Sequence, residues 1–130
     1  ILFLRSAFIF GGLAVVLGAF AAHLLKELLE VGRVTIFETG VRYQFYNAMA
    51  LGLTGLLPDY FSTQRLRWAG RFFILGIFCF SGPLYLLALR DLWGIAHWWW
   101  LGPITPIGGT FFILGWIWLL LASYPGSQKS

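Results

Sequence analysis

The residues best suited to chemistry lie together in one long apolar stretch, residues 37–57. They are an acid, a base and three hydrogen-bonding side chains: Glu38, Arg42, Tyr43, Gln44 and Asn47. Such groups could relay protons or ions, because an ionisable residue inside a membrane segment is a functional candidate by default. However, Glu38 precedes Arg42 by four residues, the favourable order for an intrahelical ion pair. Both charges fall in the first turns of the expected helix and no ionisable residue follows Asn47 there, so we interpret the pair as structural.

Helical periodicity divides this stretch into faces. At 100° per residue, Tyr43, Asn47, Ala50 and Thr54 share one face, and Gln44 lies at its edge. Polar groups at membrane depth are costly unless they face protein. We therefore expect this face to be turned toward neighbouring helices.

Two further hydroxyls lie on the third apolar segment, beside a proline. Ser81 and Tyr85 are four residues apart and flank Pro83, which removes a backbone donor and releases the carbonyl of Cys79. We expect a kink there, with the two hydroxyls either bonding to freed backbone groups or reaching the 37–57 helix. Thr105 in the fourth segment completes the candidate polar cluster.

The histidine and cysteine residues give little support for a metal or haem site. The only histidines, His23 and His97, do not stand in a metal-ligand spacing such as HExxH. A two-histidine haem site is conceivable, but His23 ends the first apolar segment and His97 precedes the fourth, so structural roles are favoured. The single cysteine, Cys79, excludes an intrachain disulfide and a cysteine-only metal site. We predict no enzyme activity, no metal and no cofactor, and leave a bound lipid open.

The composition is typical of an integral membrane protein. Of the 130 residues, 59% are hydrophobic and 11% are charged, against about 25% charged residues in soluble domains. Four uncharged runs approach the ~20 residues that cross a bilayer: 6–22, 43–58, 72–89 and 92–128. The last run is too long for one crossing, and Pro103 and Pro106 favour a helix that starts near Ile104.

We predict an all-α fold, a single integral membrane domain built as a four-transmembrane-helix bundle. The expected helices cover about residues 3–24, 37–57, 66–89 and 104–123. Small residues should form the helix contacts: Ala14, Gly18 and Ala22 are spaced by four, and Gly108 and Gly115 share a face. Trp93 and Trp98–Trp100 are expected at one membrane interface, and Trp116 and Trp118 at the other.

The basic residues indicate orientation rather than a nucleic-acid partner. Nine basic residues, in a chain of net charge +4, are spread over short loops as membrane-flanking anchors. Four crossings put both termini on one side, and basic residues accumulate in cytoplasmic loops. The terminal side holds Arg5, Arg65, Arg67, Arg71 and Lys129, and the other side holds Lys26, Arg33, Arg42 and Arg90. We therefore predict that both termini are cytoplasmic.

Four sequence strings resemble a known family. They are GAFAAH (18–23), FETGVRYQFYNAMAL (37–51), FSGPLYLLAL (80–89) and GPITPIGGTFFILGW (102–116). These strings are similar to the domain-of-unknown-function 423 family, which includes transmembrane protein 256. The resemblance implies a small four-helix protein of bacterial inner membranes, with mitochondrial relatives, and it brings no biochemical activity with it.

Three positions depart from the pattern of that family. The family typically has glycine where Ala21 stands, histidine where Asn47 stands and serine where Pro83 stands. Without that histidine the chain lacks the best intramembrane titratable group that the family offers, which disfavours proton transfer. Asn47 can still form a hydrogen bond between helices.

We predict a non-enzymatic accessory or scaffold subunit of a larger membrane protein complex, respiratory or photosynthetic in type, in the bacterial inner membrane. Its partners would be membrane lipids and other integral membrane proteins, and no nucleic acid. With 19% aromatic residues and almost no extramembrane domain, lateral helix packing is the main available interaction. The alternative is a small oligomeric transporter or channel with a polar path along Glu38, Arg42, Tyr43, Gln44 and Asn47. An enzyme acting on a lipid or quinone would need a nucleophile or metal that the sequence does not supply.

Overall fold

The computed structural model describes residues 2–90, 94 and 101–124, and over these residues it is helical without a strand. The first helix runs through a π turn: α1 (Leu2–Phe20) passes into η1 (Ala21–Leu25) and ends with α2 (Lys26–Leu28). The charged segment after His23 is therefore helical, up to the extended residue Leu29. The expected aromatic belt at Trp93 and Trp98–Trp100, together with His97, lies outside the described residues.

The remaining helices follow the expected order. α3 (Val31–Leu56) begins directly after Glu30. The third helix is built from α4 (Thr63–Gly76), the π turn η2 (Ile77–Ser81) and α5 (Gly82–Leu89). Ser62 starts it as an N-cap, because its side chain accepts the amide of Arg65 at 3.4 Å. The last helix is α6 (Leu101–Ala122).

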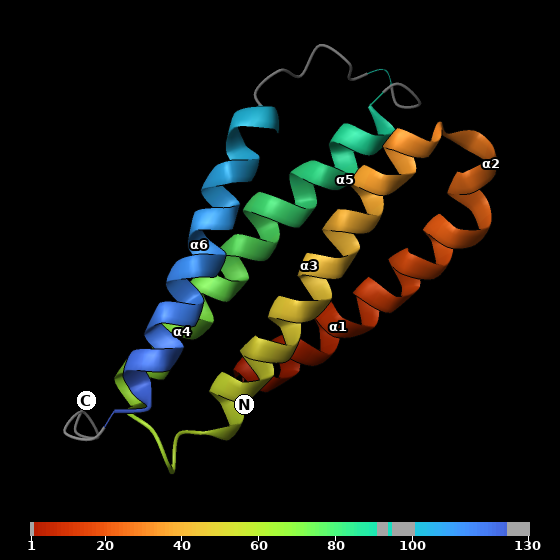
Figure 1. The fold of residues 1–130 in the computed structure, drawn as a ribbon. Helices are drawn as coiled ribbons and strands as arrows, with labels where there is room; N and C mark the ends of the chain where they lie inside the picture. Colours follow the sequence, from red (N-terminus) through yellow and green to blue (C-terminus); the bar gives the residue numbers. More distant parts are fainter. Residues whose placement is uncertain (1, 91–93, 95–100, 125–130) are drawn as a thin grey trace.

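The helices run antiparallel to their neighbours, with α3 and α4–α5 between α1 and α6 (Figure 1). A Cβ built on Gly55 would meet Leu4, and one built on Gly18 would meet Val41, so α1 and α3 run in opposite directions. Just before α4, the amide of Ser62 donates to the carbonyl of Ala122, the last residue of α6, at 3.1 Å. The start of α1, the start of α4 and the end of α6 therefore share one end of the fold.

Three of the helices are long and apolar enough to cross a membrane by length and composition. They are Leu2–Leu28, Thr63–Leu89 and Leu101–Ala122. α3 has 26 residues but is not among them, since polar residues such as Arg42, Gln44 and Asn47 lower its mean hydropathy. These three helices therefore agree with the predicted membrane-spanning character by length and composition, and a crossing by α3 stays a prediction.

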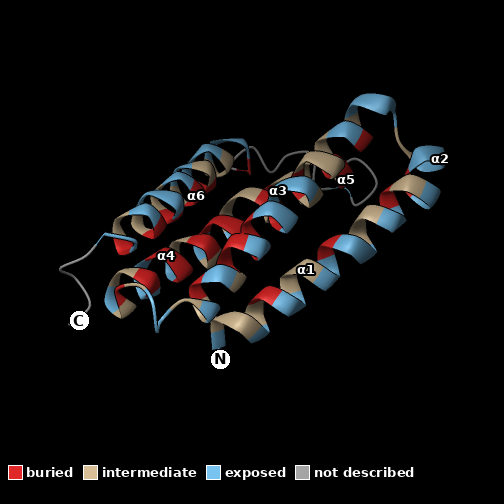
Figure 2. Cartoon of the chain, turned by 60° about the horizontal axis from the view of Figure 1, so that its bottom comes forward, coloured by how far each residue is buried: buried red, intermediate tan, exposed pale blue. Residues whose placement is uncertain are grey.

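Two apolar clusters form the core, one toward each end. The first contains Ala7, Ala50, Leu51, Leu66, Ala69, Phe73, Leu119 and Ala122; the second contains Ala21, Leu25, Val34, Phe37, Ala88 and Leu89. Figure 2 shows the buried positions on the inward sides of the helices and exposed positions outside. On α3, the buried polar residues Gln44 and Asn47 lie between the residues of the two clusters.

The start of α3 differs from the sequence-based expectation. The helix begins at Val31 and not near Phe37. The hydroxyl of Thr35 donates to the carbonyl of Val31 at 3.0 Å and that of Thr39 donates to the carbonyl of Thr35 at 2.9 Å. Because these hydroxyls bond within the helix, the polar first turns remain helical. Arg42 is consequently the twelfth of the 26 residues and not a first-turn residue.

The helices around Pro83 and Pro106 also differ from the sequence-based expectation. Before Pro83, the amide of Gly82 donates to the carbonyl of Ile77 five residues earlier, which makes the wider turn of a π-helix. The helix therefore deviates next to Pro83 through a π turn, which is one of the usual causes of a kink. α6 begins at Leu101, so Pro106 lies inside the helix rather than in its first turn, where its missing donor leaves one helical hydrogen bond unmade.

Candidate functional site

Gln44 links three helices in the middle of the fold. Its amide nitrogen donates to the carbonyl of Phe10 in α1 at 2.7 Å, and its amide oxygen accepts the hydroxyl of Tyr85 in α5 at 2.6 Å. Nearby, the hydroxyl of Ser81 donates to the carbonyl of Gly40 at 2.7 Å. Both hydroxyls of the third helix therefore bond to α3, which is the second of the two expected alternatives.

Asn47 makes a fourth connection, to α6. The indole nitrogen of Trp116 donates to its side-chain oxygen at 3.2 Å, and its side-chain nitrogen donates to the carbonyl of Tyr43 at 2.8 Å. Trp116 was expected at a membrane interface, and this prediction missed its role. The available signal was chemical: an indole N–H in an apolar segment needs an acceptor, and Asn47 is one of the few side chains that offers one.

The other predicted polar residues do not join this network. Glu38 is half-buried and Arg42 is exposed, and no hydrogen bond or ion pair joins either side chain to another described residue. The expected ion pair between them is therefore not formed. Thr105 lies apart, because its hydroxyl donates to the carbonyl of Leu101 in its own helix at 3.1 Å.

The small residues of α1 face α3 to different degrees. Ala14 is fully buried, and a Cβ on Gly18 would lie 3.3 Å from Cγ1 of Val41. Ala22 is only half-buried, in the π turn η1. Close approach of α1 to α3 is not confined to these three residues, since a Cβ built on Gly55 would lie 3.0 Å from the amide nitrogen of Leu4 at the start of α1.

Two of the glycines of α6, Gly108 and Gly115, face the third helix directly. A Cβ built on Gly108 would lie 2.6 Å from the carbonyl oxygen of Cys79, and closer still to the amide nitrogen of Phe80. One built on Gly115 would lie 2.7 Å from the ring of Phe73. Gly108 thus sits against the backbone of the π turn η2, while Gly115 makes room for an aromatic ring.

A lateral crevice of about 610 Å³ opens between α3, η2 and α6. Tyr43 and Tyr46 line it from α3, with their rings 5.8 Å apart, and Tyr43 also packs on Phe80 at 5.1 Å. Both tyrosines are exposed, and their hydroxyls have no hydrogen-bond partner among the described residues. The middle of α3 therefore presents polar groups outward as well as inward.

This arrangement fixes helices rather than assembling reactive groups. Gln44 and Asn47 together connect α3 to α1, α5 and α6 through their amides. Among the residues that the structure describes, no group of three or more histidine, cysteine or acidic side chains could hold a metal ion. The interaction that these side chains make is hydrogen bonding between helices.

Replacing Asn47 with leucine should lower the free energy of unfolding by about 1 kcal/mol, the usual scale of an interhelical hydrogen bond in a membrane. The change removes the acceptor of the Trp116 indole and replaces the amide with an apolar side chain of similar size. Unfolding in mixed detergent and SDS micelles would measure it. Thr110→Val is the matched control, because the Thr110 hydroxyl bonds only to Pro106 of its own helix; an equal loss in both variants would contradict the role of the link.

Comparison with known proteins places the chain in a family. The family described as "Protein of unknown function (DUF423)" matches residues 17–109. A UPF0382 membrane protein of Staphylococcus epidermidis is 40% identical over 111 residues, which cover 85% of each chain. YwdK of Bacillus subtilis, also a UPF0382 membrane protein, is 38% identical over 112 residues, covering 85% of this chain and 86% of its own.

A Gram-negative relative gives the same result. The UPF0382 membrane protein of Haemophilus influenzae is 38% identical over 117 residues, which cover 88% of this chain and 86% of the relative. No solved structure matches. With most of its length aligned to these bacterial membrane proteins and three helices apolar enough to cross a bilayer, the chain belongs to the DUF423 family.

Proposed function

We propose that this membrane protein crosses the bacterial inner membrane four times and serves as an accessory subunit of a larger membrane assembly, which it meets through the middle of α3. α3 would be the fourth crossing, since at about 1.5 Å per residue its 26 residues exceed the ~30 Å of hydrocarbon. It packs along α1 from Gly55 to Val41. The basic residues at the start of α4 support cytoplasmic termini.

The observation that carries the proposal is the unpartnered polar group on the outer side of α3. Arg42 is exposed near the middle of the helix and has no partner among the described residues. A charged side chain at the centre of a bilayer costs at least about 2.5 kcal/mol and normally pairs with another group. The exposed hydroxyls of Tyr43 and Tyr46 follow it along the same helix. A neighbouring protein that supplies an acid and hydrogen-bond acceptors would satisfy all three.

The shape beside Arg42 also suits a helix of another protein. A groove of about 300 Å³ runs between α1 and α3, and its lining includes Ala14, Gly18 and Phe45 as well as Arg42. Small residues on a groove floor allow a second helix to approach closely. A partner helix seated there would bring its own acidic side chain to the arginine.

The test is a pull-down of the tagged chain from mild-detergent membranes, with the co-purifying proteins identified and the complex sized. We expect a stoichiometric integral membrane partner, and we expect the triple variant Arg42→Gln, Tyr43→Phe, Tyr46→Phe to lose at least 80% of it at unchanged chain level. Lys26→Gln is the matched control, since Lys26 is exposed on α2, away from the middle of α3.

The opposite result would be a chain that purifies alone or only with copies of itself. That outcome would exclude the accessory role and direct attention to the transport alternative, which needs Arg42 to face a water-filled path between copies. Proton and ion flux through vesicles containing Arg42→Gln would then be compared with flux through the unaltered chain.

A further inference from the structure

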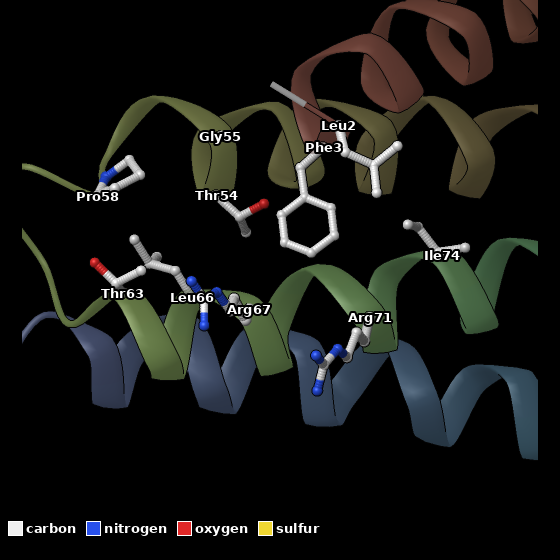
Figure 3. A pocket seen from close by; sticks show the side chains of 10 residues that line it. All are labelled: Leu2, Phe3, Thr54, Gly55, Pro58, Thr63, Leu66, Arg67, Arg71 and Ile74. Atoms are coloured by element: carbon white, nitrogen blue, oxygen red, sulfur yellow. The ribbon is translucent and has the colours of Figure 1, made fainter. Parts of the chain in front are cut away.

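A pocket of about 490 Å³ lies at the terminal end of the fold, away from the α3 face discussed above. It is formed where the start of α1 meets the end of α3 and the length of α4 from Thr63 to Ile74. Figure 3 shows Phe3 projecting from α1 between the other two helices, with Leu66 and Ile74 on the α4 side. The interior of the pocket is therefore mostly apolar.

Two arginines of α4 also line this pocket. Arg67 and Arg71 are four residues apart, so they lie on the same face of the helix. The guanidinium of Arg71 lies 5.1 Å from the ring centre of Trp68, which restrains its position. Both arginines are exposed, and neither forms a hydrogen bond or ion pair with another described residue.

The neighbouring Arg65, unlike Arg67 and Arg71, has a hydrogen-bond partner within the chain. Arg65 donates to the carbonyl of Leu121 at 2.7 Å and so caps the end of α6. The sequence places a single acid, Asp59, between residues 39 and 90. Arg67 and Arg71 are thus two positive charges at one pocket that the described chain does not neutralise.

The depth of the two arginines matches the level of lipid phosphates. Residues 72–89 carry no charge, so Arg71 is the last charged residue before the apolar part of the third helix. Charged side chains at that boundary reach the headgroup region. Arginine forks bind phosphate oxygens in pairs, and the apolar interior below them suits an acyl chain.

We propose that this pocket binds one anionic phospholipid, with its phosphate between Arg67 and Arg71 and the first part of an acyl chain against Phe3, Leu66 and Ile74. The positive charge selects an anionic headgroup, as basic pockets between membrane helices do. The apolar lining selects a lipid over a free phosphate. This proposal does not depend on the accessory role, because the pocket lies at the terminal end of the fold and the accessory role concerns the middle of α3.

The test is native mass spectrometry of the delipidated full chain in mild detergent, titrated with phosphatidylglycerol, phosphatidylcholine of equal chain length, or soluble glycerophosphate. We expect one phosphatidylglycerol to bind at least tenfold more tightly than phosphatidylcholine. Arg67→Gln with Arg71→Gln should weaken its binding about 25-fold, from about fivefold for each charge near an anionic lipid. The control Lys26→Gln removes one charge at an exposed position on α2 and should change binding less than twofold, against about fivefold for Arg71→Gln alone.

Three results would overturn the proposal: equal affinity for the two lipids, unchanged affinity in the Arg67 and Arg71 variant, or glycerophosphate binding as tightly as the lipid. Elution volume of each variant would report folding. If the double variant does not elute as the unaltered chain does, Arg71→Gln alone serves instead. A fivefold loss of phosphatidylglycerol affinity is then expected, and no loss would count against the site.

Discussion

Replacing Gly108 with alanine is expected to lower the free energy of unfolding by about 3 kcal/mol, the upper end of the usual cost of overpacking a core. The added methyl group would lie 2.6 Å from the carbonyl oxygen of Cys79 and against the amide nitrogen of Phe80. These are backbone atoms of the π turn η2, which cannot move aside as a side chain could. Relief would require α6 to shift away from the third helix and from Asn47. SDS unfolding in mixed micelles, with the yield of monodisperse protein, would measure the loss.

The adjacent glycine provides a matched control. A Cβ on Gly109 would meet only the ring of Phe80, at 3.7 Å and beyond, which is ordinary contact. Gly109→Ala should therefore be neutral or slightly stabilising, since alanine favours the helix over glycine by up to about 1 kcal/mol. If Gly108→Ala were as mild as Gly109→Ala, the close contact between α6 and η2 would not exist in the folded protein.

The number and order of the helices could be predicted because the uncharged runs are long. Their ends were harder to place, since helix boundaries in a charged segment depend on local hydrogen bonds. Thr35 and Thr39 bond back to their own helix and carry α3 six residues further toward Val31 than expected. That shift moves Arg42 to mid-helix, and it removes the basis for treating Glu38 and Arg42 as interfacial charges.

The inward polar face of α3 was predictable from helical periodicity. Asn47 and Thr54 are buried on the expected side of α3, and Gln44 at its edge is buried as well. Tyr43 is 43% exposed, because its ring lies at the rim of the crevice and packs on Phe80 of the third helix without being enclosed. The partners of these amides depend on how helices distant in sequence align, which periodicity along one helix does not encode.

The π turn η2 could not be predicted in full from the sequence of its own helix. Pro83 indicated that the third helix must deviate, and the deviation is a wider turn just before it. That choice is coupled to Gly108 on a different helix, because the backbone of η2 occupies the space that a side chain there would need. The resemblance to the DUF423 family covered the strings that hold both residues, without revealing their contact.

Gln44→Leu should lower the free energy of unfolding by about 2 kcal/mol, and the effect should be larger than that of any other single substitution in the polar middle. Leucine keeps the volume but loses the bonds to Phe10 and Tyr85 together, each worth roughly 0.6–1.7 kcal/mol in a membrane. It also leaves the Tyr85 hydroxyl without its acceptor between helices, an additional cost in an apolar interior. The same SDS unfolding assay would measure it.

A double-mutant cycle with Tyr85→Phe separates the two bonds of Gln44. Phenylalanine removes only the hydroxyl, so the cycle isolates the coupling between Gln44 and Tyr85, expected at about 1 kcal/mol. Gln44→Leu in the Tyr85→Phe background should then cost only the bond to Phe10. If the two substitutions were strictly additive, the 2.6 Å contact would carry no net energy, and the α1 link alone would account for the burial of Gln44. A coupling of the expected size would instead make this glutamine the residue that holds α1, α3 and α5 in register.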